Sequence, residues 1–117
     1  MLVLWVAPGG AIGAAARHLL TVWTVAIFGE AFPYGTLLCN LAGSTAIGWL
    51  APSLEHDGAK AFWLIGVLGG FTTFSSFSLQ TWRLIEQDAV GLAALYAVLS
   101  FGLCLAGVAF GLMLARG

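Results

Sequence analysis

The stretch Gly69–Ser78 reads GGFTTFSSFS and lies near the middle of an apolar run from about residue 61 to residue 84. The run can cross a bilayer, because roughly 20 helical residues at about 1.5 Å each span the hydrocarbon. Glycine weakens a helix, and serine and threonine compete for its backbone hydrogen bonds. The stretch predicts a membrane helix broken near its middle, with an ion site at the break. An intact helix with a small-residue packing face is the alternative.

The composition is that of an integral membrane protein. Of the 117 residues, 61% are hydrophobic and 8% are charged, whereas soluble domains carry about 25% charged residues. The length leaves room for about four spans of roughly 20–25 residues. We predict one all-α transmembrane domain over residues 1–117, with spans at about residues 2–28, 34–50, 61–84 and 92–114. The net charge of −1 and the scattered basic residues argue against a nucleic-acid partner.

The first predicted span carries a charge around its middle. Arg17 follows Gly9–Gly13, a small-residue face suited to close helix packing like the face that Gly107 and Gly111 form on the last span. A charged side chain at that depth needs an aqueous cavity or a partner. The alternative is a shorter span, from which Arg17 reaches the interface along its aliphatic stem.

Polar residues repeat at helical spacing in the second and fourth spans. Thr36, Asn40 and Ser44 are four residues apart and share one face. The same spacing recurs at Tyr96, Ser100 and Cys104. The Asn40 amide can donate two hydrogen bonds to an anion, or it can join two helices. The hydroxyls of Thr36 and Ser44 on the same face favour the interpretation that Asn40 binds an anion.

Two phenylalanines follow the predicted break. Phe74 and Phe77 are three residues apart and are expected to share a helix face. An aromatic ring has a positive edge, which can contact a small anion. Packing is the commoner role of such a pair. The polar residues that repeat on the second and fourth spans favour a role in a pore instead.

The basic residues are balanced across the predicted membrane. Four spans place both termini and the middle loop on one side with Lys60 and Arg116, whereas Arg83 and Arg17 belong to the other side. The Lys/Arg bias that normally sets orientation is then missing. We expect such a chain to insert both ways and to pair as an antiparallel dimer.

Rival functions lack the residues that they need. A small proton-coupled multidrug exporter needs a carboxylate inside the membrane, yet the acids fall in or beside predicted loops: Glu30, Glu55, Asp57, Glu86 and Asp88. No nucleophile–base pair or metal-ligand cluster indicates an enzyme. Cys39 and Cys104 fit buried small residues better than a disulfide. A non-conducting packing subunit is a further alternative, in which Asn40 and the hydroxyls have no function.

Three motifs resemble the Fluc (CrcB-like) family of fluoride channels over nearly the whole chain. Residues 9–14 read GGAIGA and precede Arg17, and residues 35–37 read GTL and precede Asn40. Residues 69–77 read GGFTTFSSF and are similar to the third-span signature of the family. The motifs occur in the family's order on four spans.

The resemblance implies a dual-topology antiparallel homodimer in the cell (inner) membrane that exports cytoplasmic fluoride passively through two pathways. It implies that Arg17 lies near an aqueous vestibule. The implied pore residues are Asn40, Phe74, Phe77, Thr36, Ser75, Tyr96 and Ser100. A structural sodium ion is also implied, held between the subunits by the backbone carbonyls of Gly69 and Thr72.

The chain departs from the family pattern at three positions. His18 follows Arg17 where the family usually has tyrosine, and Ser76 stands where threonine is common. Cys104 stands where the polar track of the family usually has a hydroxyl. Because a thiol is a weaker hydrogen-bond donor, we expect one end of the track to differ.

Overall fold

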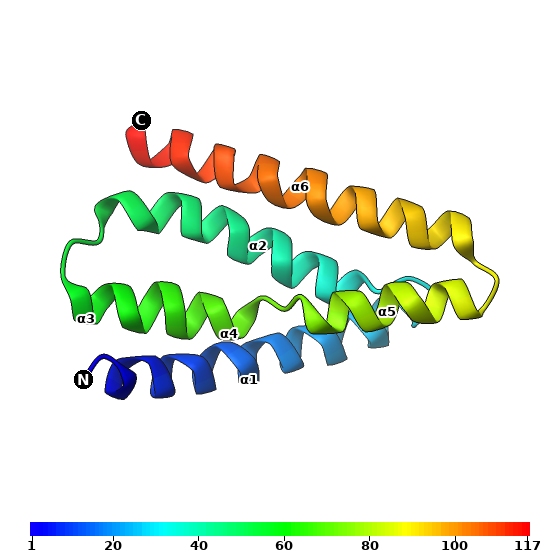
Figure 1. Ribbon diagram of the computed structural model, residues 1–117, viewed down its shortest axis with the longest axis horizontal. Helices are drawn as coiled ribbons and strands as arrows, with labels where there is room; N and C mark the ends of the chain where they lie inside the picture. The colour runs from blue at the N-terminus through cyan, green and yellow to red at the C-terminus, as the bar shows by residue number, and fades with distance from the viewer.

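The computed structural model describes residues 1–117 and is entirely helical, with no strand. The chain reverses direction between α1 and α2, between α2 and α3, and between α5 and α6, so neighbouring segments lie antiparallel (Figure 1). The α-helices are α1 (Val3–Phe28), α2 (Tyr34–Leu50), α3 (Asp57–Lys60), α4 (Gly69–Phe71), α5 (Ser75–Glu86) and α6 (Val90–Arg116). A 3-10 turn, η1 (Ala51–Ser53), follows α2, and a π-helix, η2 (Ala61–Leu68), joins α3 to α4.

Three stretches are long and apolar enough to cross a membrane: Val3–Phe28, Asp57–Glu86 and Val90–Arg116. The longest dimension of the molecule is 47 Å, close to the roughly 40–45 Å of a bilayer with its headgroups. Large apolar side chains such as Leu105, Val98 and Met113 are exposed along the outside. These features confirm an all-helical, multi-pass membrane protein.

Residues 51–60, which lie between the second and third predicted spans, are partly helical. Helix α3 begins at Asp57, because the His56 imidazole caps it: its Nδ1 accepts a hydrogen bond from the Gly58 N–H at 3.0 Å. The helical segment therefore begins four residues before the predicted start at residue 61. His56 itself is exposed.

Glycines let α1 approach the η2–α4 segment backbone to backbone. A Cβ built on Gly66 would lie 2.9 Å from the Gly9 Cα, and one built on Gly70 would lie 2.7 Å from the Gly10 carbonyl oxygen. A Cβ on Gly13 would overlap the Val67 carbonyl oxygen. The small-residue face predicted at residues 9–13 is therefore confirmed as a helix contact surface.

Helices α2 and α6 form the second close contact. A Cβ on Gly107 would lie 2.7 Å from the Thr45 hydroxyl oxygen, and one on Gly111 would lie 2.7 Å from the Trp49 nitrogen. Larger residues would separate the two backbones. The predicted pair of glycines on the last helix is therefore confirmed as a packing face.

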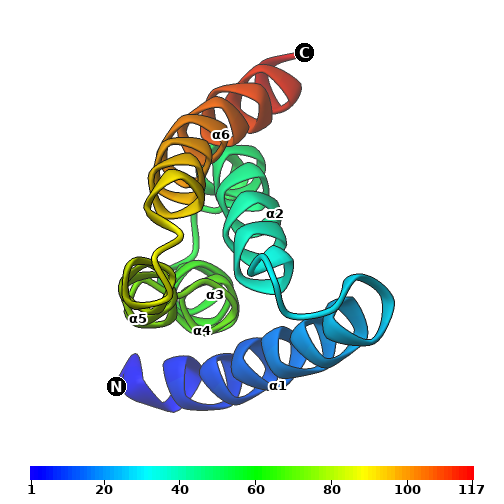
Figure 2. The ribbon, with the colours of Figure 1, turned by 90° about the vertical axis from the view of Figure 1, so that its right-hand side faces the viewer.

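The segment from α3 to α5 packs against two different helices. Helices η2 and α4 pack on α1, whereas α5 packs on α6. The end-on view shows α1 and α6 at opposite sides of the bundle, with α2 and the α3–α5 segment between them (Figure 2). Residues 72–74, between α4 and α5, are not helical. Thr72 there has an extended backbone, with φ −90° and ψ 158°.

Candidate functional site

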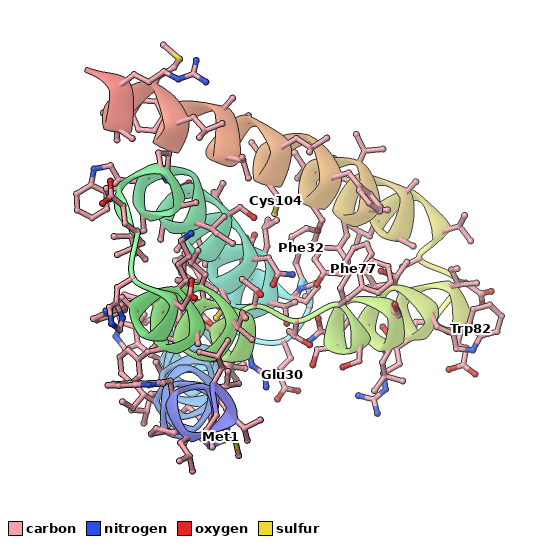
Figure 3. All side chains as sticks on the ribbon, turned by 60° about the vertical axis from the view of Figure 1, so that its left-hand side comes forward. Met1, Glu30, Phe32, Phe77, Trp82 and Cys104 are labelled. Atoms are coloured by element: carbon pink, nitrogen blue, oxygen red, sulfur yellow. The ribbon has the colours of Figure 1, made fainter.

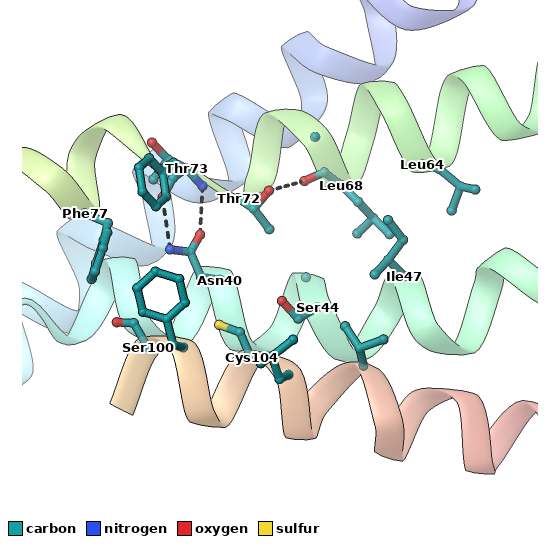
Figure 4. Close-up of a pocket in the computed structure, with 16 residues that line it drawn as sticks. Asn40, Ser44, Ile47, Leu64, Leu68, Thr72, Thr73, Phe77, Ser100 and Cys104 are labelled. Atoms are coloured by element: carbon teal, nitrogen blue, oxygen red, sulfur yellow. Dashed lines mark hydrogen bonds between the residues drawn. The ribbon is translucent and has the colours of Figure 1, made fainter. Parts of the chain in front are cut away.

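A cavity of about 510 Å³ opens where α2, α6 and the non-helical residues 72–74 meet (Figure 4). Its apolar walls include Leu64, Leu68, Phe77 and Phe101. Its polar lining consists of Asn40, Ser44, Thr72, Thr73, Ser100 and Cys104. Buried polar groups are rare and usually functional within membrane segments, so the cavity is the candidate site.

Asn40 clamps the backbone of Thr73. Its Oδ1 accepts a hydrogen bond from the Thr73 N–H at 2.7 Å, and its Nδ2 donates to the Thr73 carbonyl oxygen at 3.0 Å (Figure 4). One Nδ2 hydrogen therefore remains for a ligand, where the sequence argument allowed two. The amide combines both roles that were considered for it, since it joins two segments and still lines the cavity.

The clamp changes the bonding of the carbonyls at the end of α4. In a continuous helix the Thr73 N–H would donate to the Gly69 carbonyl, four residues earlier, but here it donates to Asn40. The Leu68 carbonyl accepts from both the Thr72 N–H and the Thr72 hydroxyl, each at 3.0 Å. Gly69 and Thr72 both line the cavity, so the freed carbonyl of Gly69 belongs to a segment that borders the site.

An aromatic cluster closes one end of the cavity. Phe77 is 7% exposed, and its ring centroid lies 5.1 Å from Tyr96 and 5.9 Å from Phe101. Phe74 lies just before α5, with its centroid 5.5 Å from Phe77, but it is 68% exposed. Figure 3 shows Phe77 between the helices near Phe32, whereas Trp82 on the same helix points outward. The two predicted pore phenylalanines thus meet, but only Phe77 is buried.

Ser100 is the one buried side chain whose polar atom has no partner. It is 7% exposed, and its Oγ makes no hydrogen bond. An unpaired hydroxyl in an apolar setting costs about 1–3 kcal/mol. Because Ser100 lines the cavity, a polar guest there would supply the missing bond.

A polar cleft lies beside the aromatic cluster. A hollow of about 240 Å³ is lined by Arg17, His18, Thr21, Thr36, Ser76 and Gln80, with Ala14. A second hollow of about 320 Å³ shares Thr21, Thr36 and Gln80 with the first and continues to Arg83. The two form one polar cleft from the α5 end of the molecule to Arg17.

Arg17 lies midway along α1 and turns inward. Its Nε donates a hydrogen bond to the Gly70 carbonyl oxygen at 3.2 Å. Helix α1 is continuous from Val3 to Phe28, so Arg17 lies within one long helix. Arg17 thus joins α1 to α4 and lines the polar cleft.

Most of the predicted site residues line the cavity or the polar cleft, and the two that line neither are Tyr96 and Ser75. Asn40, Phe74, Phe77, Ser100, Gly69 and Thr72 line the cavity. Arg17 and Thr36 line the polar cleft, and Tyr96 is fully buried between the two. Ser75 lines neither: it is exposed, with its Oγ 3.3 Å from the Thr73 hydroxyl. Cys104, expected at the deviating end of the track, lines the cavity.

Sequence reasoning missed Gln80 and Thr73. The Gln80 Oε1 accepts the Tyr96 hydroxyl at 2.9 Å and borders both hollows of the cleft. Gln80 could have been found from its spacing, because it follows Ser76 by four residues and the two side chains therefore share one face of α5. Thr73 is recognised only through its partner Asn40, 33 positions earlier in the chain.

The titratable residues form no other centre. No group of three or more His, Cys, Asp or Glu residues is arranged to hold a metal ion. Cys39 and Cys104 are free thiols, as predicted. The five acids lie outside the helices or at their ends: Glu30, Glu55, Asp57, Glu86 and Asp88. A carboxylate for proton exchange is therefore missing from the interior.

Comparison with known proteins matches residues 4–112 to the family described as CrcB-like protein, camphor resistance. The fluoride-specific ion channel FluC of Cereibacter sphaeroides is 49% identical over 117 residues, covering 98% of this chain and 94% of the relative. FluC 2 of Nitrobacter hamburgensis is 45% identical over 118 residues, covering 97% and 95%. FluC of Ruegeria sp. is 48% identical over 119 residues, covering 98% and 94%.

Proposed function

Because the chain belongs to the CrcB-like family, we propose that it is a passive, fluoride-selective ion channel through which a cell sheds cytoplasmic fluoride. The similar proteins are named ion channels, which confirms the prediction that the chain is not an enzyme. The observation that carries the proposal is the cavity in which Asn40 and the unpaired Ser100 hydroxyl meet the ring of Phe77.

The cavity offers hydrogen-bond donors that can replace the water molecules that a fluoride ion loses when it enters a pore. Fluoride is strongly hydrated, so a pore must replace its water with other hydrogen-bond donors. The free hydrogen of the Asn40 amide and the Ser100 hydroxyl are such donors, and ring edges of Phe77 and Phe74 add weak positive contacts. Few and separate donors allow the ion to leave again, which conduction requires.

The polar cleft is the proposed entrance. An anion is attracted by Arg83 at the outer end of the cleft and by Arg17 at its inner end. Between them Thr36 and Gln80 supply polar groups, and Tyr96 and Phe77 separate the cleft from the cavity. Arg17 thus fits the vestibule role that the resemblance implies. Ser75, exposed in the single chain, is assigned to the pathway only through that resemblance.

We place four crossings in the inner membrane, with α2 as the second crossing and the third interrupted at residues 72–74. The cavity is open in the single chain, and one chain of 117 residues is small for enclosing a pore. An antiparallel second copy would cover it and give two pathways per dimer, consistent with the balance of basic residues.

A structural sodium ion fits the end of α4. Helix carbonyls carry partial negative charge at a C-terminus, and the Gly69 carbonyl is freed by the clamp between Asn40 and Thr73. Oxygen donors of this kind suit a hard alkali cation, and no acidic cluster competes with them. Gly69 and Thr72 of both subunits would hold the ion, whose charge makes the membrane interior more favourable for an anion.

Fluoride efflux from liposomes tests the proposed function. Liposomes that contain the purified protein are loaded with either potassium fluoride or potassium chloride, and a potassium ionophore lets potassium follow the anion. We expect the first set to release fluoride and the second set to retain chloride. A fluoride electrode measures the release. Release no faster than from protein-free liposomes, or equal release of chloride, would refute a fluoride-selective channel.

The phenylalanine pair gives a further prediction. Phe74→Ile and Phe77→Ile are each expected to lower fluoride efflux by about tenfold or more, because an aliphatic side chain has no positive edge to offer. Phe110→Ile is the matched control, since Phe110 is exposed on α6 and lies outside the cavity. Size-exclusion chromatography checks that each variant keeps the native assembly. Normal efflux from both Phe74→Ile and Phe77→Ile would show that the aromatic rings are not needed for conduction.

A further inference from the structure

The two cysteines of the chain have different surroundings. Cys39 is fully buried, and its Sγ lies 3.9 Å from the Arg17 carbonyl oxygen that it faces. Cys104 is only partly buried and makes no hydrogen bond to the protein; it lines the cavity (Figure 4). The chain thus contains one protected thiol and one thiol that borders the candidate site.

A second observation indicates that polar molecules reach this part of the cavity. Ser100, one helical turn before Cys104, is 7% exposed and has an Oγ without a partner. Ser44 of α2 lines the cavity as well. Since buried hydroxyls are almost always satisfied, the unpaired Ser100 Oγ is explained by a polar guest that enters the cavity. Such a guest passes within one helical turn of the Cys104 thiol.

We propose that Cys104 is a covalent modification site at which a small thiol-reactive electrophile closes the ion pathway. The proposal rests on the proposed function, because closure presupposes conduction through this cavity. It depends on the thiol, since a hydroxyl at position 104 could not react in the same way. Cys39 is excluded as the site because its side chain is 0% exposed.

The reaction can be written for methyl methanethiosulfonate, a small neutral reagent. The Cys104 sulfur attacks the methylthio sulfur, an S–S bond to the methylthio group forms, and the S–S bond to the sulfonyl group breaks. The thiol proton and the leaving group depart as methanesulfinic acid, and the product is a mixed disulfide. No other oxidant is needed, and a dithiol reductant restores the thiol.

The bulk of the product explains the closure. The added methylthio group extends from the α6 wall into the space bordered by Ser44, Ser100 and Leu68. It replaces a thiol by an apolar group that offers no donor to an anion. Donors must follow one another for a strongly hydrated ion to move, so one blocked position is enough to stop flux.

The test uses the protein reconstituted in liposomes, as the native chain and as Cys39→Ser, Cys104→Ser and Cys104→Ala variants. Each protein is compared with its own untreated sample. Intact-protein mass spectrometry counts the methylthio groups, and a fluoride electrode measures efflux. We expect the native chain and Cys39→Ser to gain one group and to lose efflux by about tenfold or more. Both Cys104 variants should gain none and keep their own rate, and dithiothreitol should restore efflux where it was lost.

Two outcomes would overturn the proposal while leaving the channel intact. One is an unmodified Cys104 in a conducting protein, and the other is a modified Cys104 with unchanged efflux. No efflux from any untreated sample would refute the channel itself, and closure with it. In that case the mass measurement would still show whether the thiol is accessible.

Discussion

Asn40→Asp is expected to abolish fluoride efflux. The aspartate can still accept the Thr73 N–H, but its second oxygen would face the Thr73 carbonyl oxygen, to which the Asn40 amide now donates at 3.0 Å. Two acceptors would then repel each other, and the added negative charge would repel an anion in the cavity. Like-charge contacts cost several kcal/mol and each ~1.4 kcal/mol is tenfold, so we expect a loss of about a hundredfold or more.

Ser53→Asp is the control for the added charge. Ser53 is exposed in η1, far from the cavity, so an aspartate there adds the same charge outside the pathway. Efflux from this variant should stay near the native rate. Native-like efflux from Asn40→Asp would show that neither the clamp nor the remaining amide hydrogen is needed for conduction.

Gly111→Ala is expected to lower the stability of the fold by about 1–3 kcal/mol, the usual effect of overpacking. A Cβ at this position would overlap the Thr45 carbonyl oxygen and lie 2.7 Å from the Trp49 nitrogen. Both atoms belong to the backbone of α2, so no side-chain rotation makes room. Helices α2 and α6 would have to separate, and the cavity between them would change shape. Detergent-solubilised protein should unfold at a lower temperature.

Gly91→Ala is the matched control on the same helix. A Cβ built on Gly91 meets no atom within 4 Å, and alanine is the better helix former. Its unfolding temperature should equal or slightly exceed the native value. Equal unfolding temperatures for Gly111→Ala and the native chain would show that α2 and α6 do not depend on this close approach.

Residue spacing was sufficient to predict the packing faces and most of the site. Gly9 and Gly13 are four residues apart on one helix, and Gly107 and Gly111 are four residues apart on another, so helix geometry alone places each pair on one face of its helix. The same argument placed Asn40 and Ser100 on faces that now meet at one cavity. Periodicity works here because each of these residues lies on a regular helix.

Other features depend on contacts between distant segments, which spacing does not encode. The partner of Asn40 is the backbone of Thr73, 33 positions away, and any residue type could supply that backbone. Phe74 was expected to share a helix face with Phe77, but α5 begins only at Ser75, so its ring is set by a non-helical backbone and is exposed. The start of α3 at Asp57 was missed because the cap comes from an imidazole, an uncommon capping group.

The division of the α3–α5 segment between two neighbours has a mechanical consequence. Its first half packs on α1 and its second half packs on α6, while α2 contacts both of those helices. The two halves meet at the non-helical residues 72–74, where Asn40 bridges from α2, so a displacement of one half relative to the other would change the torsion angles of this link. Gly69 and Thr72, whose carbonyls we propose as cation ligands, border this link, so a displacement at either flank would change the positions of those carbonyls.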